Sequence, residues 1–157
     1  MRLDHTTPSA ARVDTGLAVL RAATGTIFVA HGAQKLFVFG LAGVTGAFEG
    51  MGIPFAGVAG PLTAFVELLG GLALIAGLLT PLAAAGLAVT MLGAITLVHL
   101  PNGFFAPSGI EFPLALLAAT VTLAITGAGR FSLDALVAAR RHPVGTGSVV
   151  RPLRRAA

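Results

Sequence analysis

The stretch PLTAFVELLGGLALIAGLLTP, residues 61–81, decides the fold of this chain. Its only charged residue is Glu67, and it provides the roughly 20 apolar residues that a helix needs to cross a hydrocarbon core about 30 Å thick. Pro61 suits a first helical turn, while Thr80 can cap the next helix and Pro81 can open it. This short connection predicts two neighbouring antiparallel membrane helices, at about residues 61–79 and 81–100.

Composition extends this prediction to the whole chain. Of the 157 residues, 55% are hydrophobic and only 10% are charged, and the mean hydropathy of +0.92 is far above that of a soluble domain. Two further apolar segments, at about residues 17–39 and 110–126, have the length or composition of membrane spans. The predicted fold class is therefore all-α, a four-helix transmembrane bundle with a short C-terminal amphipathic helix.

The remaining segments define the domain organisation. Seven glycines and Pro54 interrupt residues 40–60, which predicts a long outer loop with a short interfacial helix near residues 45–51. A second outer loop is expected at residues 99–109, and Ser132 is expected to cap an amphipathic helix lying along the membrane surface over residues 132–141. The predicted parts are an N-terminal tail (1–16), a membrane domain (17–137) and a basic C-terminal tail (138–157).

The distribution of Lys and Arg predicts the orientation. Three such residues occur up to Arg21, one occurs at Lys35, and six occur from Arg130 onward. The positive-inside rule then places both termini in the cytoplasm and both outer loops on the opposite side. A cleavable signal peptide is the alternative for the N-terminus, although the apolar run continues beyond the small residues at positions 30–33.

Glycines recur at seven-residue spacing in the second span (Gly70, Gly77) and in the third (Gly86, Gly93). Such spacing places small residues on one stripe of each helix and predicts close helix packing. The chain has no cysteine, which excludes thiol chemistry and iron–sulfur clusters from anything that it does alone.

Ionisable residues inside the spans are the candidate site. Arg21, Thr24, Phe28, His31 and Lys35 follow a 3-4-3-4 spacing, which predicts one stripe facing the other helices. Counting helical rise from Pro61 places Glu67 about 9 Å below the outer edge of the membrane, with Lys35 and His31 near the same level. His99 and Glu111 begin or end spans at the outer face. Residues of this kind usually face a bundle interior or a wet cavity.

Each of these residues also has a structural interpretation. Lys35 could extend to the interface, His99 could be a loop histidine bonded to backbone, and Glu111 could favour a helix N-terminus. Glu49 is expected to be a solvated loop carboxylate. The structural interpretation of Glu67 is an ion pair with Lys35 or His31, whereas an unpaired Glu67 would take up a proton because it is desolvated.

The order of AHGAQKL, FEGMGIPF, VELLGGLALIAGLLTP, HLPNGFF, GIEFPLALL and GAGRFSLD resembles the DoxX family over about residues 17–137. The resemblance implies a four-helix bundle in the bacterial plasma membrane, associated with respiratory or sulfur redox chemistry and redox stress. Relatives are described as subunits of quinol oxidases and thiosulfate:quinone oxidoreductases, or as membrane partners of soluble oxidoreductases and detoxifying enzymes. The family positions that match are His31, Lys35, Glu67, His99 and Glu111.

Two main hypotheses follow. The first is a quinone-linked oxidoreductase subunit with its electron source on another chain, in which Glu67 and Lys35 are catalytic and His31, His99 and Glu111 help to bind the quinone. The second is a non-catalytic anchor for a soluble oxidoreductase or a sulfur-metabolism or detoxifying enzyme, held by the segment 132–141 and the basic tail, which could also contact membrane lipid.

Two further alternatives stay open at this point. One is a small-solute or proton pathway, and the other is a haem held between His31 and His99. The usual di-iron spacing of Glu and then His three residues later is missing at Glu67 and Glu111, so no di-iron site is expected. No other metal and no haem is expected either. No nucleic-acid partner is expected, because a membrane orientation explains the basic termini. The sequence leaves the substrate, the partner and the oligomeric state undetermined.

Overall fold

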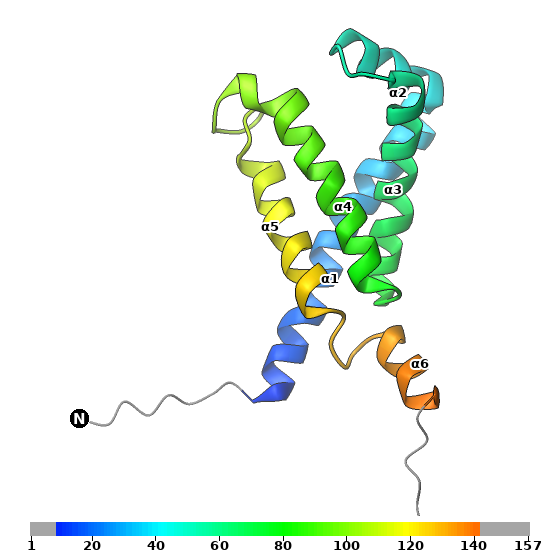
Figure 1. Ribbon diagram of the computed structural model, residues 1–157, viewed down its shortest axis with the longest axis vertical. Helices are drawn as coiled ribbons and strands as arrows, with labels where there is room; N and C mark the ends of the chain where they lie inside the picture. The colour runs from blue at the N-terminus through cyan, green and yellow to red at the C-terminus, as the bar shows by residue number, and fades with distance from the viewer. Residues whose placement is uncertain (1–8, 142–157) are drawn as a thin grey trace, which may run out of the picture.

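A computed structural model describes residues 9–141. Over this range the chain forms helices and no strand, which confirms the all-α prediction (Figure 1). The predicted tails lie mostly outside the described residues. The elements are α1 (Ala10–Ala33), η1 (Gln34–Phe39), α2 (Gly40–Gly50), α3 (Ala56–Ala76), α4 (Thr80–Ala94), η2 (Ile95–His99), η3 (Leu100–Asn102), α5 (Glu111–Thr126) and α6 (Leu133–Arg141).

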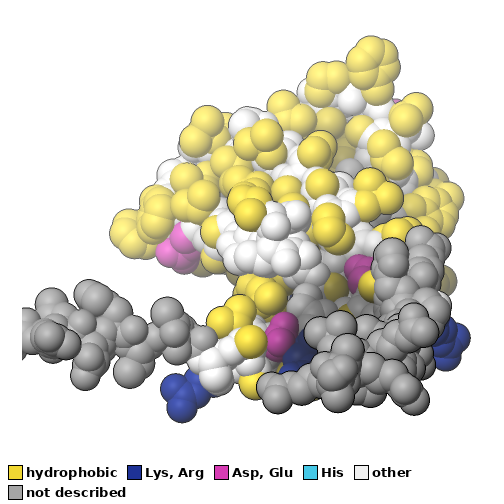
Figure 2. All heavy atoms as spheres, turned by 60° about the horizontal axis from the view of Figure 1, so that its bottom comes forward, with side chains coloured by type: hydrophobic (Ala, Val, Ile, Leu, Met, Phe, Trp, Pro, Cys, Tyr) yellow, Lys and Arg dark blue, Asp and Glu magenta, His cyan; other side chains and the backbone are white. Residues whose placement is uncertain are grey.

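Three stretches are long and apolar enough to cross a membrane by length and composition, namely Ala10–Gly50, Ala56–Ala76 and Thr80–Asn102. The fourth helix, α5, is apolar but has 16 residues and is about 24 Å long. Hydrophobic side chains cover the flanks of the molecule, and in the view of Figure 2 the Lys and Arg side chains lie near the grey terminal segments. This is the surface expected of a membrane bundle, whose helices face lipid.

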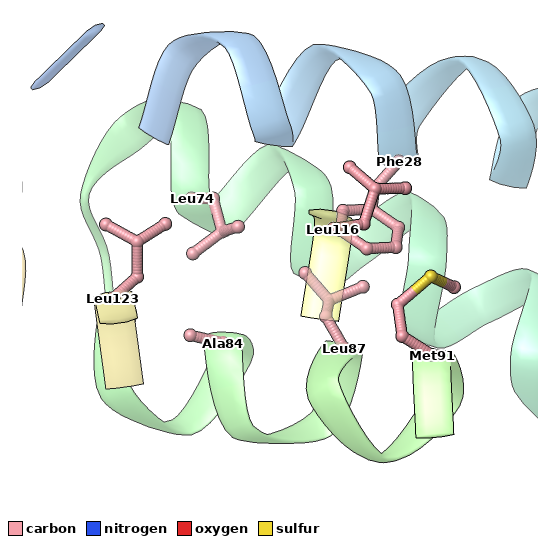
Figure 3. Close-up of a cluster of buried hydrophobic side chains, with 7 residues drawn as sticks. All are labelled: Phe28, Leu74, Ala84, Leu87, Met91, Leu116 and Leu123. Atoms are coloured by element: carbon pink, nitrogen blue, oxygen red, sulfur yellow. The ribbon is translucent and has the colours of Figure 1, made fainter. Parts of the chain in front are cut away.

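The helices form two close pairs, α1 with α3 and α4 with α5 (Figure 1). Both pairs meet at one end of the bundle, called here the terminal end, where α1 enters and α6 is attached. They lean apart toward the other end, called here the loop end, which carries α2 and the 103–110 loop. The buried core (Figure 3) joins the pairs and consists of Phe28, Leu74, Ala84, Leu87, Met91, Leu116 and Leu123.

Close packing of α1 on α3 depends on glycines that sequence analysis did not select. A Cβ atom on Gly71 would lie 2.7 Å from the carbonyl oxygen of Gly25, so neither position has room for a side chain. The predicted stripes were only partly right. Gly70 does pack against Leu87, whereas a Cβ on Gly93 would meet no atom within 4 Å.

The predicted outer loop at residues 40–60 is mostly helical. Gly40, with φ of 68° and ψ of 163°, redirects the chain, and α2 then packs on the first turns of α3, where Val44 lies opposite Gly60. The predicted start of the second helix at Pro61 was wrong, because α3 begins at Ala56 and contains Pro61. Packing against α2 buries Ala56 and Gly60 and so stabilises helical turns that local glycine and proline content disfavours.

Candidate functional site: an ion pair on the wall of an apolar cavity

The centre of the candidate site is an ion pair between Lys35 and Glu67. The Lys35 Nζ donates to Glu67 Oε2 at 2.5 Å, and the two side chains expose 20% and 5% of their surface. Lys35 lies on the π-helical segment η1, and Glu67 lies on α3. The close α1–α3 approach at Gly25 and Gly71 continues at Gly32, where an added Cβ would clash with the backbone of Leu68, and it brings the two helices near enough for this contact. The structural partner predicted for Glu67 is therefore Lys35.

Glu67 lies near the middle of α3. It is eleven residues from Ala56 and nine from Ala76, which places it about 16 Å and 14 Å from the two ends of the helix. The prediction from the sequence counted from Pro61, whereas α3 begins five residues earlier, at Ala56. Lys35 contacts Glu67, so its ammonium group lies beside the middle of α3 and is held by a partner within the bundle.

The pair borders a cavity of about 720 Å³ between the two diverging helix pairs. Most of the wall is apolar, with side chains such as Phe28, Met91 and Leu116 at its base. The polar side chains that line it are His31, Lys35, Thr63, Glu67, Thr90 and His99. Its volume lies within the range of pockets for small molecules and cofactors, and such pockets typically combine apolar walls with few polar groups.

His31 and His99 also line the cavity, but at its margins. The exposed ring of His31 lies against Phe112 of α5, with 6.1 Å between ring centroids and 49° between planes. His99 Nδ1 lies 2.7 Å from the carbonyl oxygen of Ser108, so this nitrogen donates the hydrogen bond. This hydrogen bond is the predicted backbone contact, and it fixes the His99 ring toward the loop end. The same ring forms part of the cavity wall.

Glu111 lies outside the cavity lining. Its Oε1 accepts a 2.7 Å hydrogen bond from the Ala106 amide, while the Glu111 amide donates to the Phe104 carbonyl. Glu111 therefore folds the 103–110 loop over the start of α5. The sequence had suggested that all four helices bring ionisable groups to one level. The structure brings Lys35 and Glu67 together at mid-depth and places His99 and Glu111 toward the loop end.

The inward-facing stripe predicted on the first helix is confirmed for its three N-terminal residues. Arg21, Thr24 and Phe28 expose 2%, 3% and 1% of their surface. Among cavity residues, sequence reasoning missed Thr63 and Thr90. Thr63 precedes Glu67 by four residues, and this spacing on one helix face was a signal that could have found it.

A second polar cluster, at the terminal end, was not predicted. The buried Arg21 guanidinium donates to the carbonyls of Leu74 at 3.1 Å and Phe131 at 2.5 Å. The Asp134 carboxylate of α6 accepts hydrogen bonds from the amides of Leu79 (2.8 Å) and Thr80 (3.0 Å). These contacts attach α6 to the bundle, and the sequence signal for them was the GAGRFSLD segment.

Asp134 also corrects the predicted cap of the third helix. The Thr80 hydroxyl makes no capping hydrogen bond, and the helix is capped from α6 instead. A carboxylate is well suited to this position because the first amides of a helix are unpaired and partly positive. Ser132 does cap α6 as predicted, since its hydroxyl accepts from the Ala135 amide at 3.1 Å. Within residues 9–141, no three His, Asp or Glu side chains are grouped to hold a metal ion.

The fold and the site together define a small helical membrane protein with a mid-depth ion pair beside an apolar cavity. A family model described as DoxX matches residues 16–100, and the chain belongs to this family. It is 34% identical over 137 residues to an uncharacterized membrane protein of Mycobacterium tuberculosis, covering 80% of this chain and 83% of the relative.

A second relative has a name that mentions an activity. The chain is 34% identical over 124 residues to a Bacillus subtilis protein named "Putative oxidoreductase CatD", covering 79% of this chain and 88% of the relative. No solved structure gives a significant match.

Proposed function

We propose that this DoxX-family protein is the membrane subunit of a redox system in the plasma membrane and that its cavity binds quinone or quinol. The observation that carries the proposal is the Lys35–Glu67 pair on the wall of a mostly apolar cavity. A quinone needs hydrogen-bond donors for its oxygens, a group that exchanges protons, and apolar surroundings for its chain. The name of the B. subtilis relative agrees with redox chemistry.

The charges of the pair favour a neutral ligand. Lys35 and Glu67 together carry no net charge, so their part of the cavity has no excess charge to balance that of an anion. An ammonium group has three donors, and the contact with Glu67 uses one of them. Lys35 can therefore donate to a ligand oxygen while it remains paired with Glu67.

Reduction of a quinone to a quinol takes up two protons and two electrons. In the proposed role, Lys35 orients the ligand oxygens and Glu67 passes the two protons to them, one after the other. The His31 and His99 side chains, at the margins of the cavity, can pass protons from water at the loop end into the cavity. The electrons come from a donor on another chain, because this sequence has neither a cysteine nor a nucleotide-binding fingerprint.

Glu67→Gln tests this role because glutamine keeps the size of the side chain but cannot carry the proton. We expect quinone-linked turnover in native membranes to fall at least about 100-fold, the usual size of a general acid–base contribution. Glu49→Gln is the matched control, since Glu49 lies exposed on α2. Equal turnover of the Glu67→Gln and wild-type proteins, at equal amounts of folded protein in the membrane, would remove Glu67 from the mechanism.

We also propose a second function, as an anchor for a soluble oxidoreductase or a sulfur-metabolism or detoxifying enzyme on the cytoplasmic face. The observation in its favour is that α6 is attached to the bundle through Asp134 while its apolar side chains Leu133, Leu136 and Val137 are 43%, 58% and 42% exposed. Deletion of residues 138–157 should then release the partner from purified membranes. Retention of that partner at full occupancy would refute the anchor role.

A further inference from the structure

We infer that the cavity is entered sideways from the lipid, between α3 and α4, and that its ligand is an amphiphile whose hydrocarbon chain passes over Gly93 and Gly86. This inference rests on the proposed function in that the polar head of the ligand would lie at Lys35 and Glu67. It adds the chemical class of the ligand, which is a membrane-borne molecule with a long chain rather than a water-soluble one. Three features of the described structure support it.

The first feature is the opening itself. Leu62 of α3 and Val89 of α4 both line the cavity, and yet 57% and 71% of their surfaces are exposed. Residues that border a cavity and the exterior at once form its rim. On the α1–α5 side, the exposed His31 and the 46% exposed Phe112 also border the cavity, but their ring centroids lie 6.1 Å apart, so the two rings narrow that side. Phe48 of α2 borders the loop end of the cavity.

The second feature is the depth of this rim. Val89 and Gly93 are nine and thirteen residues beyond Thr80, which places them about 14 Å and 20 Å from the start of α4. A hydrocarbon core is about 30 Å thick, so both positions lie well within it. An opening at this depth, with Leu62 and Val89 at its rim, faces acyl chains rather than water.

The third feature is free space along α4. Gly86 and Gly93 line the cavity, and a Cβ atom on Gly93 would meet no protein atom within 4 Å. Gly70 differs, because its added Cβ would lie 3.1 Å from Leu87. A Cβ on Gly86 would meet only the end of the Val66 side chain, at 3.7 Å, so the face of α4 with Gly86 and Gly93 leaves a path that is open at Gly93 and narrower at Gly86. That path leads from the rim toward the ion pair.

Binding of two quinones to the full chain in lipid nanodiscs tests the route. One quinone carries a long isoprenoid chain, and the other carries a methyl group in its place. Gly93→Leu should weaken binding of the long-chain quinone at least tenfold and leave the methyl quinone within about twofold of wild type. Gly57→Leu is the control, because Gly57 is an exposed glycine of α3 with no atom within 4 Å of an added Cβ and does not line the cavity. No effect of Gly93→Leu, or equal weakening of both quinones, would overturn the inferred route.

A ligand-free measurement separates this inference from the proposed function. The chain has no cysteine, so Gly93→Cys provides a single attachment point for a nitroxide spin label. Relaxation by molecular oxygen, which concentrates in lipid, should exceed relaxation by a water-soluble nickel chelate. The opposite order would show a water-filled opening and overturn the inference. If the wild-type protein binds neither quinone, the proposed function fails, and the spin-label result alone then decides whether the opening faces lipid.

Discussion

Replacement of Lys35 by methionine isolates the energetics of the buried ion pair. Methionine keeps a flexible apolar stem of similar length but removes the charge that faces Glu67. The Glu67 side chain, 5% exposed, would then be a buried carboxylate without its partner. Breaking a buried pair by removing one partner is usually strongly destabilising, by about 3–5 kcal/mol.

The double variant Lys35→Met/Glu67→Gln completes the test. The glutamine is neutral and can still accept a hydrogen bond from Lys35, whose side chain is 20% exposed, so Glu67→Gln alone should cost less than Lys35→Met. In the double variant no buried charge remains unpaired, and we expect it to recover about 2–3 kcal/mol relative to Lys35→Met. The measurement is the free energy of unfolding in detergent micelles, followed by far-UV circular dichroism because the chain has no tryptophan.

Additive costs in the double variant would refute this reasoning, because they would show that Lys35 and Glu67 do not stabilise each other.

Three further predictions concern the rest of the fold. Gly71→Ala should destabilise the bundle by about 1–3 kcal/mol in the same unfolding assay because it overpacks the α1–α3 contact, whereas Gly57→Ala should be close to neutral. Asp134→Ala should lower the free energy of unfolding by about 0.5–2 kcal/mol through the lost cap, and it should speed tryptic cleavage after Arg130. Asp134→Asn keeps one acceptor oxygen and should have a smaller effect on both. Equal cleavage in both variants and wild type would contradict the attachment of α6. Reporter fusions after residue 55 and at the C-terminus should report opposite sides of the membrane, and a shared side would exclude the four-span orientation.

The existence of the helices followed from the sequence because the physical cause is local. A run such as residues 61–81 must satisfy its own backbone hydrogen bonds in lipid, and a helix does so without help from other segments. The stripe on the first helix was predictable for the same reason, since helical periodicity places Arg21, Thr24 and Phe28 on one face. Ser132 was recognisable as a cap because its hydrogen bond spans only three residues.

The predictions were wrong where contact with a distant segment changes the conformation that the local sequence favours. The helix containing Glu67 begins at Ala56 because α2 folds back onto it, and nothing in residues 56–60 alone favours a helix. The first amides of α4 are capped by Asp134, 54 residues beyond Thr80. Glu111 was predicted at the outer face as one of the candidate site residues, yet the 103–110 loop uses its carboxylate.

By itself, the sequence determined that this protein is a helical membrane bundle with ionisable residues inside its spans, because hydropathy and helical period depend only on neighbouring residues. Only the tertiary structure decided which of those residues meet and at what depth. Lys35 reaches Glu67 because two helices approach across Gly25 and Gly71, and the cavity exists because the two helix pairs diverge toward the loop end. Both facts depend on how whole helices pack against one another, which no local pattern specifies.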